Sequence, residues 1–357
     1  MNVLTRDEHR TNCCQLKCED DSARLAANLT DCVDLCYSKH LHNKNCEILC
    51  QFWASTTIVL AAIALLINSY AIFKFYRLQS MRNSHGVLSI SRSAADLIVL
   101  AILCCWCGPL SLMDVGLETA NIYKANVVLM GVTQYAWYSS VNTQFVIVME
   151  RHVAICYPFA FTRIFRVRLT HFYTAIITFV SVSEVALIWH MTGCYFYYYN
   201  TDLNIDYECR MLILELTLSG VPLLFAISLD ILSFVSLRER NNNHLASPNV
   251  TERQRDYRRA REFSLFVQSL LGTFLIVVQL IFFAITLISN FGPTKNFLFS
   301  IFWFVVVHCS NSVLQLAYNE EFRREIRLSS SNNLPPTKES LGQRRMALTG
   351  DNNFIRL

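Results

Sequence analysis

Seven long apolar runs constrain this chain more than any other feature. Each is longer than the roughly 20 residues that a helix needs to cross the hydrocarbon core of a bilayer. The chain is 53% hydrophobic and only 16% charged, a balance typical of proteins that cross a membrane several times. We therefore predict an all-α bundle of seven transmembrane helices within residues 52–318, between an extracellular segment (1–51) and a cytosolic tail (319–357). The runs cover residues 52–76, 86–110, 122–149, 169–191, 211–237, 263–290 and 296–318.

The charges of the connecting loops predict how this bundle lies in the membrane. With the adjoining ends of the runs included, Lys and Arg number 17 around the loops after the first, third and fifth runs and directly after the seventh, against 3 around the other loops. Cytosolic loops carry such an excess, so we expect the N-terminus outside the cell, the C-terminus in the cytosol and a place in the plasma membrane. The net charge of +4 reflects this excess, and no nucleic-acid-binding motif is present in the sequence.

A charged triplet ends the third run. Glu150, Arg151 and His152 begin the string E-R-x-x-A-I-C-x-P. An arginine at mid-bilayer costs about 2.5–3.5 kcal/mol, so the triplet must lie at the membrane surface, where a plain charged anchor would also lie. The string resembles the cytoplasmic end of the third helix of rhodopsin-like G-protein-coupled receptors. The resemblance implies coupling to a heterotrimeric G protein through this triplet, with Glu262 as a candidate ion-pair partner of Arg151 in the inactive state.

Polar residues inside the runs extend this resemblance. Asn68, Asp96, Ser140 and Asn311 occupy mid-membrane positions that form a sodium- and water-filled cluster in rhodopsin-like receptors. The resemblance therefore implies a sodium site at Asp96, Ser140 and Asn311, and no other cofactor. Hydrogen bonding between helices is an alternative role for the same residues.

Two further residues belong to this predicted activation machinery. Arg92 lies one turn before Asp96, and this spacing allows a direct ion pair that would compete with sodium for the carboxylate. Pro222 in the fifth run matches the kink position of the family. A proline removes one backbone hydrogen bond of a helix, which leaves a hinge there.

The end of the seventh run narrows the resemblance. The motif N-P-x-x-Y stands here with Ser312 for proline and Gln315 for tyrosine, and a short amphipathic helix ending in F-R follows. Invertebrate FMRFamide-type neuropeptide receptors also lack this proline, share M-R-x-S before the second helix, and lack the usual cysteine where this chain has Asn126. The resemblance implies an RFamide-like neuropeptide ligand. A chemosensory receptor for small molecules is the alternative, because the sixth run lacks its usual proline and Asp230 replaces a tyrosine.

Candidate ligand-binding residues lie in the outer halves of the runs, where polar groups converge on an apolar cleft. Glu215 lies about two turns before Pro222 on the same face, where it would pair with the arginine of an RFamide peptide. Helix packing is the alternative role for the aromatic residues. The other candidates are Trp106, Thr133, Gln134, Trp137, Tyr138, Trp303 and His308.

Seven of the fourteen cysteines precede the first run. The pairs Cys32/Cys36 and Cys46/Cys50 are spaced so that each pair shares one face of a helix. We expect a hairpin of two short helices with disulfides Cys32–Cys50 and Cys36–Cys46, in preference to a zinc site. Further extracellular candidates are Cys194 and Cys209 for disulfides and Asn28 for N-glycosylation.

Other classes of membrane protein fit the sequence less well. A transporter or channel would need inverted repeats or paired broken helices, and neither is visible. An enzyme would carry a motif such as HExxH, GxSxG or a P-loop, and the sequence has none. We therefore predict a non-enzymatic receptor whose partners are an extracellular peptide or small molecule, a heterotrimeric G protein and the lipid bilayer.

Overall fold

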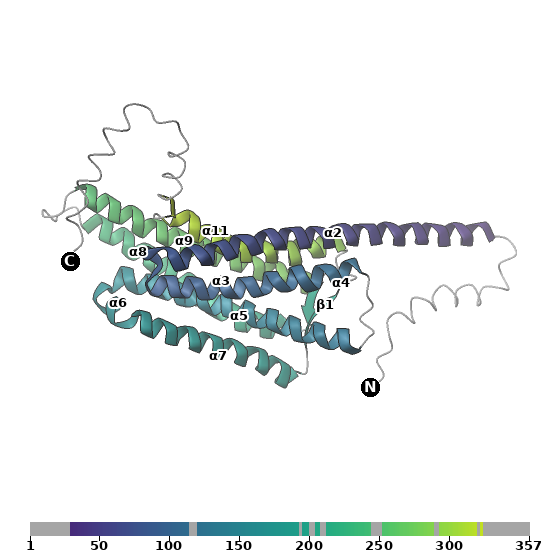
Figure 1. The fold of residues 1–357 in the computed structure, drawn as a ribbon, viewed down its shortest axis with the longest axis horizontal. Helices are drawn as coiled ribbons and strands as arrows, with labels where there is room; N and C mark the ends of the chain where they lie inside the picture. The colour runs from purple at the N-terminus through teal and green to yellow at the C-terminus, as the bar shows by residue number, and fades with distance from the viewer. Residues whose placement is uncertain are drawn as a thin grey trace, which may run out of the picture.

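The computed structural model describes residues 29–113, 120–192, 195–199, 204–207, 212–243, 252–288, 293–319 and 322–323. Long helices lie side by side in one bundle, with a small β-hairpin near one end (Figure 1). The elements are α2 (Leu29–Arg77), η1 (Gln79–Met81), α3 (Ser84–Ile102), η2 (Leu103–Cys107), α4 (Gly108–Leu112), α5 (Ala120–Cys156), α6 (Pro158–Ile164), α7 (Val167–Thr192), β1 (Phe196–Tyr199), β2 (Asn204–Tyr207), α8 (Leu212–Asn243), α9 (Glu252–Ile288), α10 (Pro293–Asn296), η4 (Phe297–Phe302) and α11 (Trp303–Tyr318).

Six helical segments among the described residues are long and apolar enough to cross a membrane. They are Ile48–Arg77, Ser84–Leu112, Val167–Met191, Ile213–Glu239, Phe263–Thr286 and Thr294–Tyr318. Each of them matches one of the predicted apolar runs.

The run at 122–149 differs from the other six because it forms the interior helix of the bundle. It lies within α5, which contacts α3, α7, α8, α9 and β1. Its polar side chains, such as Thr133, Thr143 and Gln144, are buried. They lower the mean hydropathy of α5 but face other helices rather than lipid.

A tight turn at the M-R-x-S string leads into α3. Asn83 has an extended backbone, and its side chain accepts a hydrogen bond from the backbone N–H of Gly86 at 2.9 Å. This is the N-cap arrangement that starts a helix. A Cβ at Gly86 would overlap the carbonyl oxygen of Met81, so the turn requires glycine at this position.

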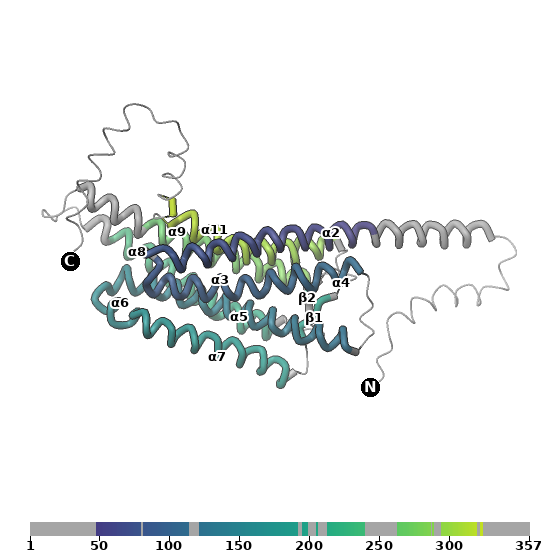
Figure 2. The backbone as a smooth tube through the Cα atoms, in the orientation of Figure 1, coloured from purple at the N-terminus to yellow at the C-terminus, as the bar shows by residue number. Residues whose placement is uncertain are grey.

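A β-hairpin that the sequence did not predict covers one end of the bundle. Phe196 pairs with Tyr207 and Tyr199 with Asn204 across two antiparallel strands. Figure 2 shows the hairpin among the helices near α4. The strand β1 contacts α5 and β2 contacts η4. Phe196, Tyr197 and Tyr198 are buried, so the aromatic strand packs into the bundle.

The predicted helical hairpin of the N-terminal segment is wrong for the described backbone. The helix α2 is continuous from Leu29 to Arg77, so Cys32 and Cys50 lie about 27 Å apart along one axis. A disulfide requires Cα atoms less than 7 Å apart, so neither Cys32–Cys50 nor Cys36–Cys46 can form within this helix. The physical reason is that residues 37–45 contain no Gly or Pro to end the helix. Asn28, Cys194 and Cys209 lie outside the described residues.

Candidate functional site

Asp96 lies at the centre of a buried polar core between α3, α5 and α11. Its Oδ1 accepts a hydrogen bond from Ser140 Oγ at 3.0 Å, and its Oδ2 accepts one from Asn311 Nδ2 at 3.1 Å. His308 Nδ1 lies 2.7 Å from Oδ1. The structure thus brings together Asp96, Ser140 and Asn311, as the sequence predicted. It adds His308, which the sequence analysis predicts in the ligand pocket.

Asn68 and Ser312 connect this core to α2. Asn68 Oδ1 accepts a hydrogen bond from Ser312 Oγ at 2.5 Å, and Asn68 Nδ2 donates to the backbone carbonyl of His308 at 3.2 Å. Ser312 Oγ also lies 3.2 Å from Ser93 Oγ. The serine that replaces the expected proline therefore joins α2, α3 and α11 through its hydroxyl group.

The donors around Asp96 do not suit a sodium ion. Hard cations require oxygen ligands, but His308 and Asn311 both direct nitrogen atoms at the carboxylate. The side-chain oxygen of Asn311 instead accepts a hydrogen bond from Gln315 Nε2 at 3.1 Å. Of the three groups that contact Asp96, only Ser140 presents an oxygen, and its hydroxyl acts as a donor.

Arg92 does not form the predicted ion pair with Asp96 in the structure. Its Nη1 donates to Gln144 Oε1 on α5. Gln144 Nε2 in turn donates to the backbone carbonyl of Ser269 at 3.1 Å and to Thr273 Oγ1 at 3.0 Å. The spacing between Arg92 and Asp96 permitted the pair, but the guanidinium reaches across to α5 while three other groups contact the carboxylate.

Asp230 closes this second network on α8. Its Oδ2 accepts from Thr273 Oγ1 at 3.2 Å, and its Oδ1 lies 3.5 Å from the Ser269 hydroxyl. Hydrogen bonds therefore connect Arg92 to Asp230 through Gln144 and Thr273, and so link α3, α5, α9 and α8. Sequence reasoning missed Gln144, Ser269 and Thr273. Their one signal is helical spacing: Gln144 lies one turn after Ser140, and Ser269 and Thr273 are one turn apart.

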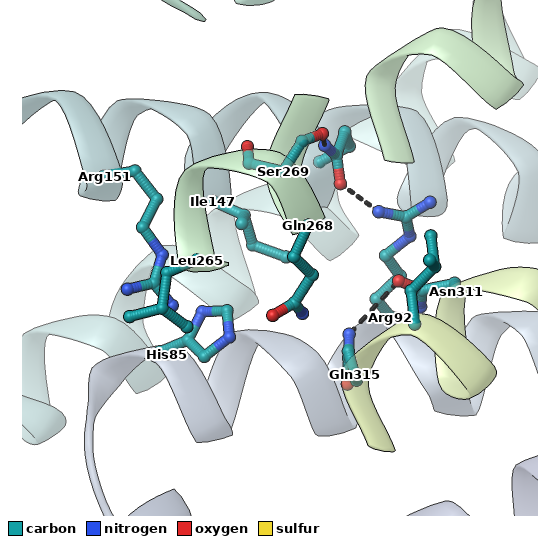
Figure 3. A pocket seen from close by; sticks show the side chains of 11 residues that line it. His85, Arg92, Ile147, Arg151, Leu265, Gln268, Ser269, Asn311 and Gln315 are labelled. Atoms are coloured by element: carbon teal, nitrogen blue, oxygen red, sulfur yellow. Dashed lines mark hydrogen bonds between the residues drawn. The ribbon is translucent and has the colours of Figure 1, made fainter. Parts of the chain in front are cut away.

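A narrow cavity lies next to these two networks. In Figure 3, Arg151 and His85 lie on one side of it, and Arg92, Asn311 and Gln315 on the other. The charged or titratable side chains of its lining are all basic. The lining residues are His85, Arg92, Gln144, Ile147, Arg151, Leu265, Gln268, Ser269, Asn311, Leu314 and Gln315.

The charged triplet at the end of the third run contacts three different parts of the bundle. Glu150 accepts a hydrogen bond from Ser84 Oγ, and its Oε2 lies 3.3 Å from His85 Nδ1. His152 Nδ1 lies 3.0 Å from Ser233 Oγ on α8, while Arg151 lines the cavity. A plain membrane anchor would leave Glu150 in solvent, whereas its exposed fraction is 2%. The side chain of Glu262 lies outside the described residues.

Glu215 forms a separate polar cluster nearer the β-hairpin. Its Oε1 accepts from Trp137 Nε1 at 3.2 Å and from Ser219 Oγ at 2.9 Å, and its Oε2 accepts from Tyr138 Oη at 2.5 Å. Trp137, Tyr138 and Glu215 thus come together as predicted. Both carboxylate oxygens are already bonded to donors of the protein. Pro222 lies inside α8, three residues after Ser219, and its hinge role stays a prediction.

Trp106 belongs to the contacts that hold the β-hairpin. Its Nε1 donates to Asn126 Oδ1 at 3.1 Å, and Asn126 Nδ2 donates to the backbone carbonyl of Tyr198 at 3.0 Å. The Tyr198 hydroxyl lies 2.6 Å from Ser111 Oγ, and burial raises the pKa of this hydroxyl. Asn126, at the position where the rhodopsin-like family has a cysteine, therefore ties the hairpin to α5 by hydrogen bonds.

The remaining predicted ligand residues take different positions. Thr133 is fully buried and donates to the backbone of its own helix, at Leu129, and Gln134 is 1% exposed. The ring of Trp303 lies 5.3 Å from that of Phe282 on α9. His308 lies deeper, in contact with Asp96, which corrects its predicted place in the ligand pocket.

Taken together, these features define a multi-span helical membrane protein with a buried polar core and a basic cavity. The family model "Serpentine type 7TM GPCR chemoreceptor Srx" matches residues 58–319. A relative from Caenorhabditis elegans, Serpentine receptor class X 45, is 24% identical over 283 residues, which cover 73% of this chain and 76% of the relative. The chain belongs to the Srx family of serpentine 7TM G-protein-coupled chemoreceptors.

This membership confirms the prediction of a G-protein-coupled receptor and multi-pass membrane protein, and the family is one of receptors rather than enzymes. It does not confirm the resemblance to FMRFamide-type neuropeptide receptors. Of the two ligand classes that the sequence left open, the chemosensory alternative fits the family better.

Proposed function

We propose that this protein is a chemosensory receptor of the plasma membrane that binds a small extracellular molecule and activates a heterotrimeric G protein. In this proposal α5 is the seventh span, the N-terminus lies outside and the C-terminus lies in the cytosol. The burial of α5 among α3, α7, α8 and α9 supports its role as a span. The excess of Lys and Arg in alternate loops supports the orientation.

The observation that carries the choice of a small molecule is the occupied carboxylate of Glu215. An RFamide peptide would bring an arginine that needs a carboxylate partner. Both oxygens of Glu215 already accept hydrogen bonds from Trp137, Tyr138 and Ser219. An arginine would have to displace these donors, and each displaced buried donor costs about 1–3 kcal/mol.

The β-hairpin also favours a small ligand. Phe196 and Tyr198 of β1 are buried, and Asn126 and Ser111 hold Tyr198 in place. The ring of Phe196 lies 6.4 Å from that of Phe283 on α9. A peptide would have to move this strand, whereas a small molecule needs only local rearrangement of side chains.

Unmatched polar atoms near the aromatic residues indicate the chemistry of the ligand. Trp303 Nε1 and Gln279 Oε1 are buried without a hydrogen-bond partner among the described residues. Buried polar groups normally have a partner, so a ligand with one or two hydrogen-bonding groups would gain by meeting them. The neighbouring rings of Trp137, Phe304 and Phe282 would pack against its apolar part. We infer a small, mainly apolar molecule with a hydrogen-bonding group.

A connected set of contacts leads from this region to the cavity. The ring of Trp137 lies 6.1 Å from that of His308, and His308 contacts Asp96. Asp96 binds Asn311, which binds Gln315 in the wall of the cavity. A ligand that moves Trp137 would therefore shift the polar core and change the cavity beside Arg151, where the G protein would bind.

Heterologous expression tests this proposal directly. The full chain would be expressed with promiscuous G proteins and exposed to volatile and soluble small molecules and, separately, to amidated peptides. We expect second-messenger responses to members of the small-molecule set, and we expect Trp137→Ala to reduce the response per receptor at the cell surface. Responses to an RFamide peptide alone, lost in Glu215→Gln, would overturn the choice of ligand.

A further inference from the structure

The contacts of Asp96 leave little room for any ion beside its carboxylate. Ser140, His308 and Asn311 approach its two oxygens at 3.0, 2.7 and 3.1 Å. Asp96 and His308 are both 1% exposed. A carboxylate in such a place must have its lone pairs satisfied, because an unpartnered buried charge is strongly destabilising. Three side chains of the protein satisfy this need.

The oxygens that could bind a cation here are directed elsewhere. Asn311 Oδ1 accepts from Gln315, and Asn68 Oδ1 accepts from Ser312. His308 Nδ1 faces a carboxylate oxygen, which can only accept, so this nitrogen carries hydrogen whether the ring is neutral or charged. The polar core is therefore arranged around nitrogen donors rather than around oxygen ligands.

His308 is fixed in this position by its surroundings. Its backbone carbonyl accepts a hydrogen bond from Asn68 Nδ2 at 3.2 Å. Its ring lies 4.6 Å from the ring of Phe304 and 6.1 Å from that of Trp137, both edge-on. Moving the ring away from Asp96 would break these packing contacts and leave the carboxylate without one of its donors.

We propose that His308 fills the position beside Asp96 that a sodium ion would take, and so makes the receptor insensitive to sodium. The side chain supplies from within the protein the stabilisation of the carboxylate that an ion would otherwise supply. The inference concerns the polar core alone and does not depend on the class of ligand. Its test requires no ligand.

The first test compares two salts with the purified full-length receptor. Thermal unfolding would be followed in sodium chloride and in choline chloride at equal concentrations, so that chloride and ionic strength are the same. We expect the two Tm values to agree within about 1 °C, because a species that does not bind the native state does not stabilise it. A saturable rise in Tm with sodium that Asp96→Asn removes would overturn the proposal.

The second test opens the position to the ion. His308→Ser removes the ring and leaves a hydroxyl oxygen, so sodium should now raise the Tm by about 2–4 °C relative to choline. The rise should vanish when Asp96→Asn is added. The matched control is His190→Ser, at an exposed residue of α7, which should show no sodium effect.

A folded His308→Ser variant that remains insensitive to sodium would show that His308 is not what excludes the ion. If this variant does not fold, His308→Asn, which also replaces the ring with a group containing an oxygen, takes its place with the same expectation. The comparison of salts on the wild-type receptor stays decisive in either case.

Discussion

The networks around Glu215 and Asn126 differ from the wall of the cavity in how their buried polar groups are satisfied. At the end covered by the β-hairpin, Glu215 and Asn126 each bond to donors or acceptors on other elements. At the other end, Arg92 Nε and Gln315 Oε1 are buried in the cavity wall without a hydrogen-bond partner among the described residues. The networks around Glu215 and Asn126 hold the hairpin in place, while the wall of the cavity keeps polar atoms available for new partners.

This contrast has a physical meaning for a receptor. Fully satisfied buried networks make a structure rigid, and partly satisfied ones raise its free energy. A partner that supplies the missing bonds at the cavity end gains affinity by doing so. We therefore expect changes at the cavity end to alter signalling, and changes at the hairpin end to alter stability first.

The largest effect should come from Arg151, which lines the cavity. Arg151→Ala removes a cationic group at the proposed G-protein site, so we expect the second-messenger response to a ligand to be abolished at normal surface expression. The matched control is Arg163→Ala at an exposed position of α6, which should respond normally. A full response from Arg151→Ala would remove the functional distinction between the two ends.

The next largest effect should come from Asn126 at the hairpin end. Asn126→Ala leaves Trp106 Nε1 and the carbonyl of Tyr198 without their partners. Each loss costs about 1–3 kcal/mol, so we expect a lower Tm and reduced surface expression, with normal coupling per receptor. Asn126→Asp keeps an acceptor for Trp106 but places a second acceptor against the Tyr198 carbonyl, so it should be no more stable than Asn126→Ala. Thermal unfolding with surface labelling would distinguish these outcomes.

A smaller effect should come from Thr273, which joins Gln144 to Asp230. Thr273→Val removes the hydroxyl but keeps the shape, and it breaks bonds between α9 and its neighbours. A net loss of about 1 kcal/mol shifts a two-state equilibrium about five-fold, so basal signalling should rise several-fold. Thr286→Val on the same helix is the control, because that hydroxyl bonds to its own helix at Phe283. Equal basal signalling in both variants would contradict a constraining role for the network.

The smallest effect should come from Glu215→Gln. The amide keeps an oxygen that can accept from Trp137 and Ser219, so potency for a small-molecule agonist should change by less than about three-fold. Dose–response curves of the variant and the wild-type receptor would measure this change. A loss of ten-fold or more, specific to ligands that carry a guanidinium group, would restore the peptide interpretation.

The sequence predicted the features that depend on periodicity and composition. The presence of a helix at each of the seven apolar runs follows from the lengths of these runs. The contacts of Asp96 with Ser140 and Asn311 follow from their similar depth in the membrane and from the faces of their helices that point into the bundle. Glu215 contacts Trp137 and Tyr138 for the same reason. These predictions required only that each helix turn its polar face inward.

Features that depend on contacts between elements could not be predicted. The sequence places His308 on an inward face, but only the packing of α3 against α11 shows that its ring reaches Asp96. Arg92 could reach either Asp96 or Gln144, and the choice depends on side-chain direction. The strand β1 is too short and too uniformly aromatic to show an alternating pattern. The cysteine spacing suggested two helices, but the intervening residues lacked a turn.

The polarity of α5 affects how this protein is made. A helix enters the bilayer readily when its own residues favour lipid, and among the described residues α5 is the long helix that is not one of the six apolar segments. Asn142 and Gln144 become inexpensive to bury only after their partners on α7 and α9 are in place. Biogenesis at the translocon should therefore require α5 to assemble with neighbouring helices. Substitutions on the faces of α5 that contact other helices should first lower the amount of receptor through degradation. A change in which ligands the receptor detects should appear only after that.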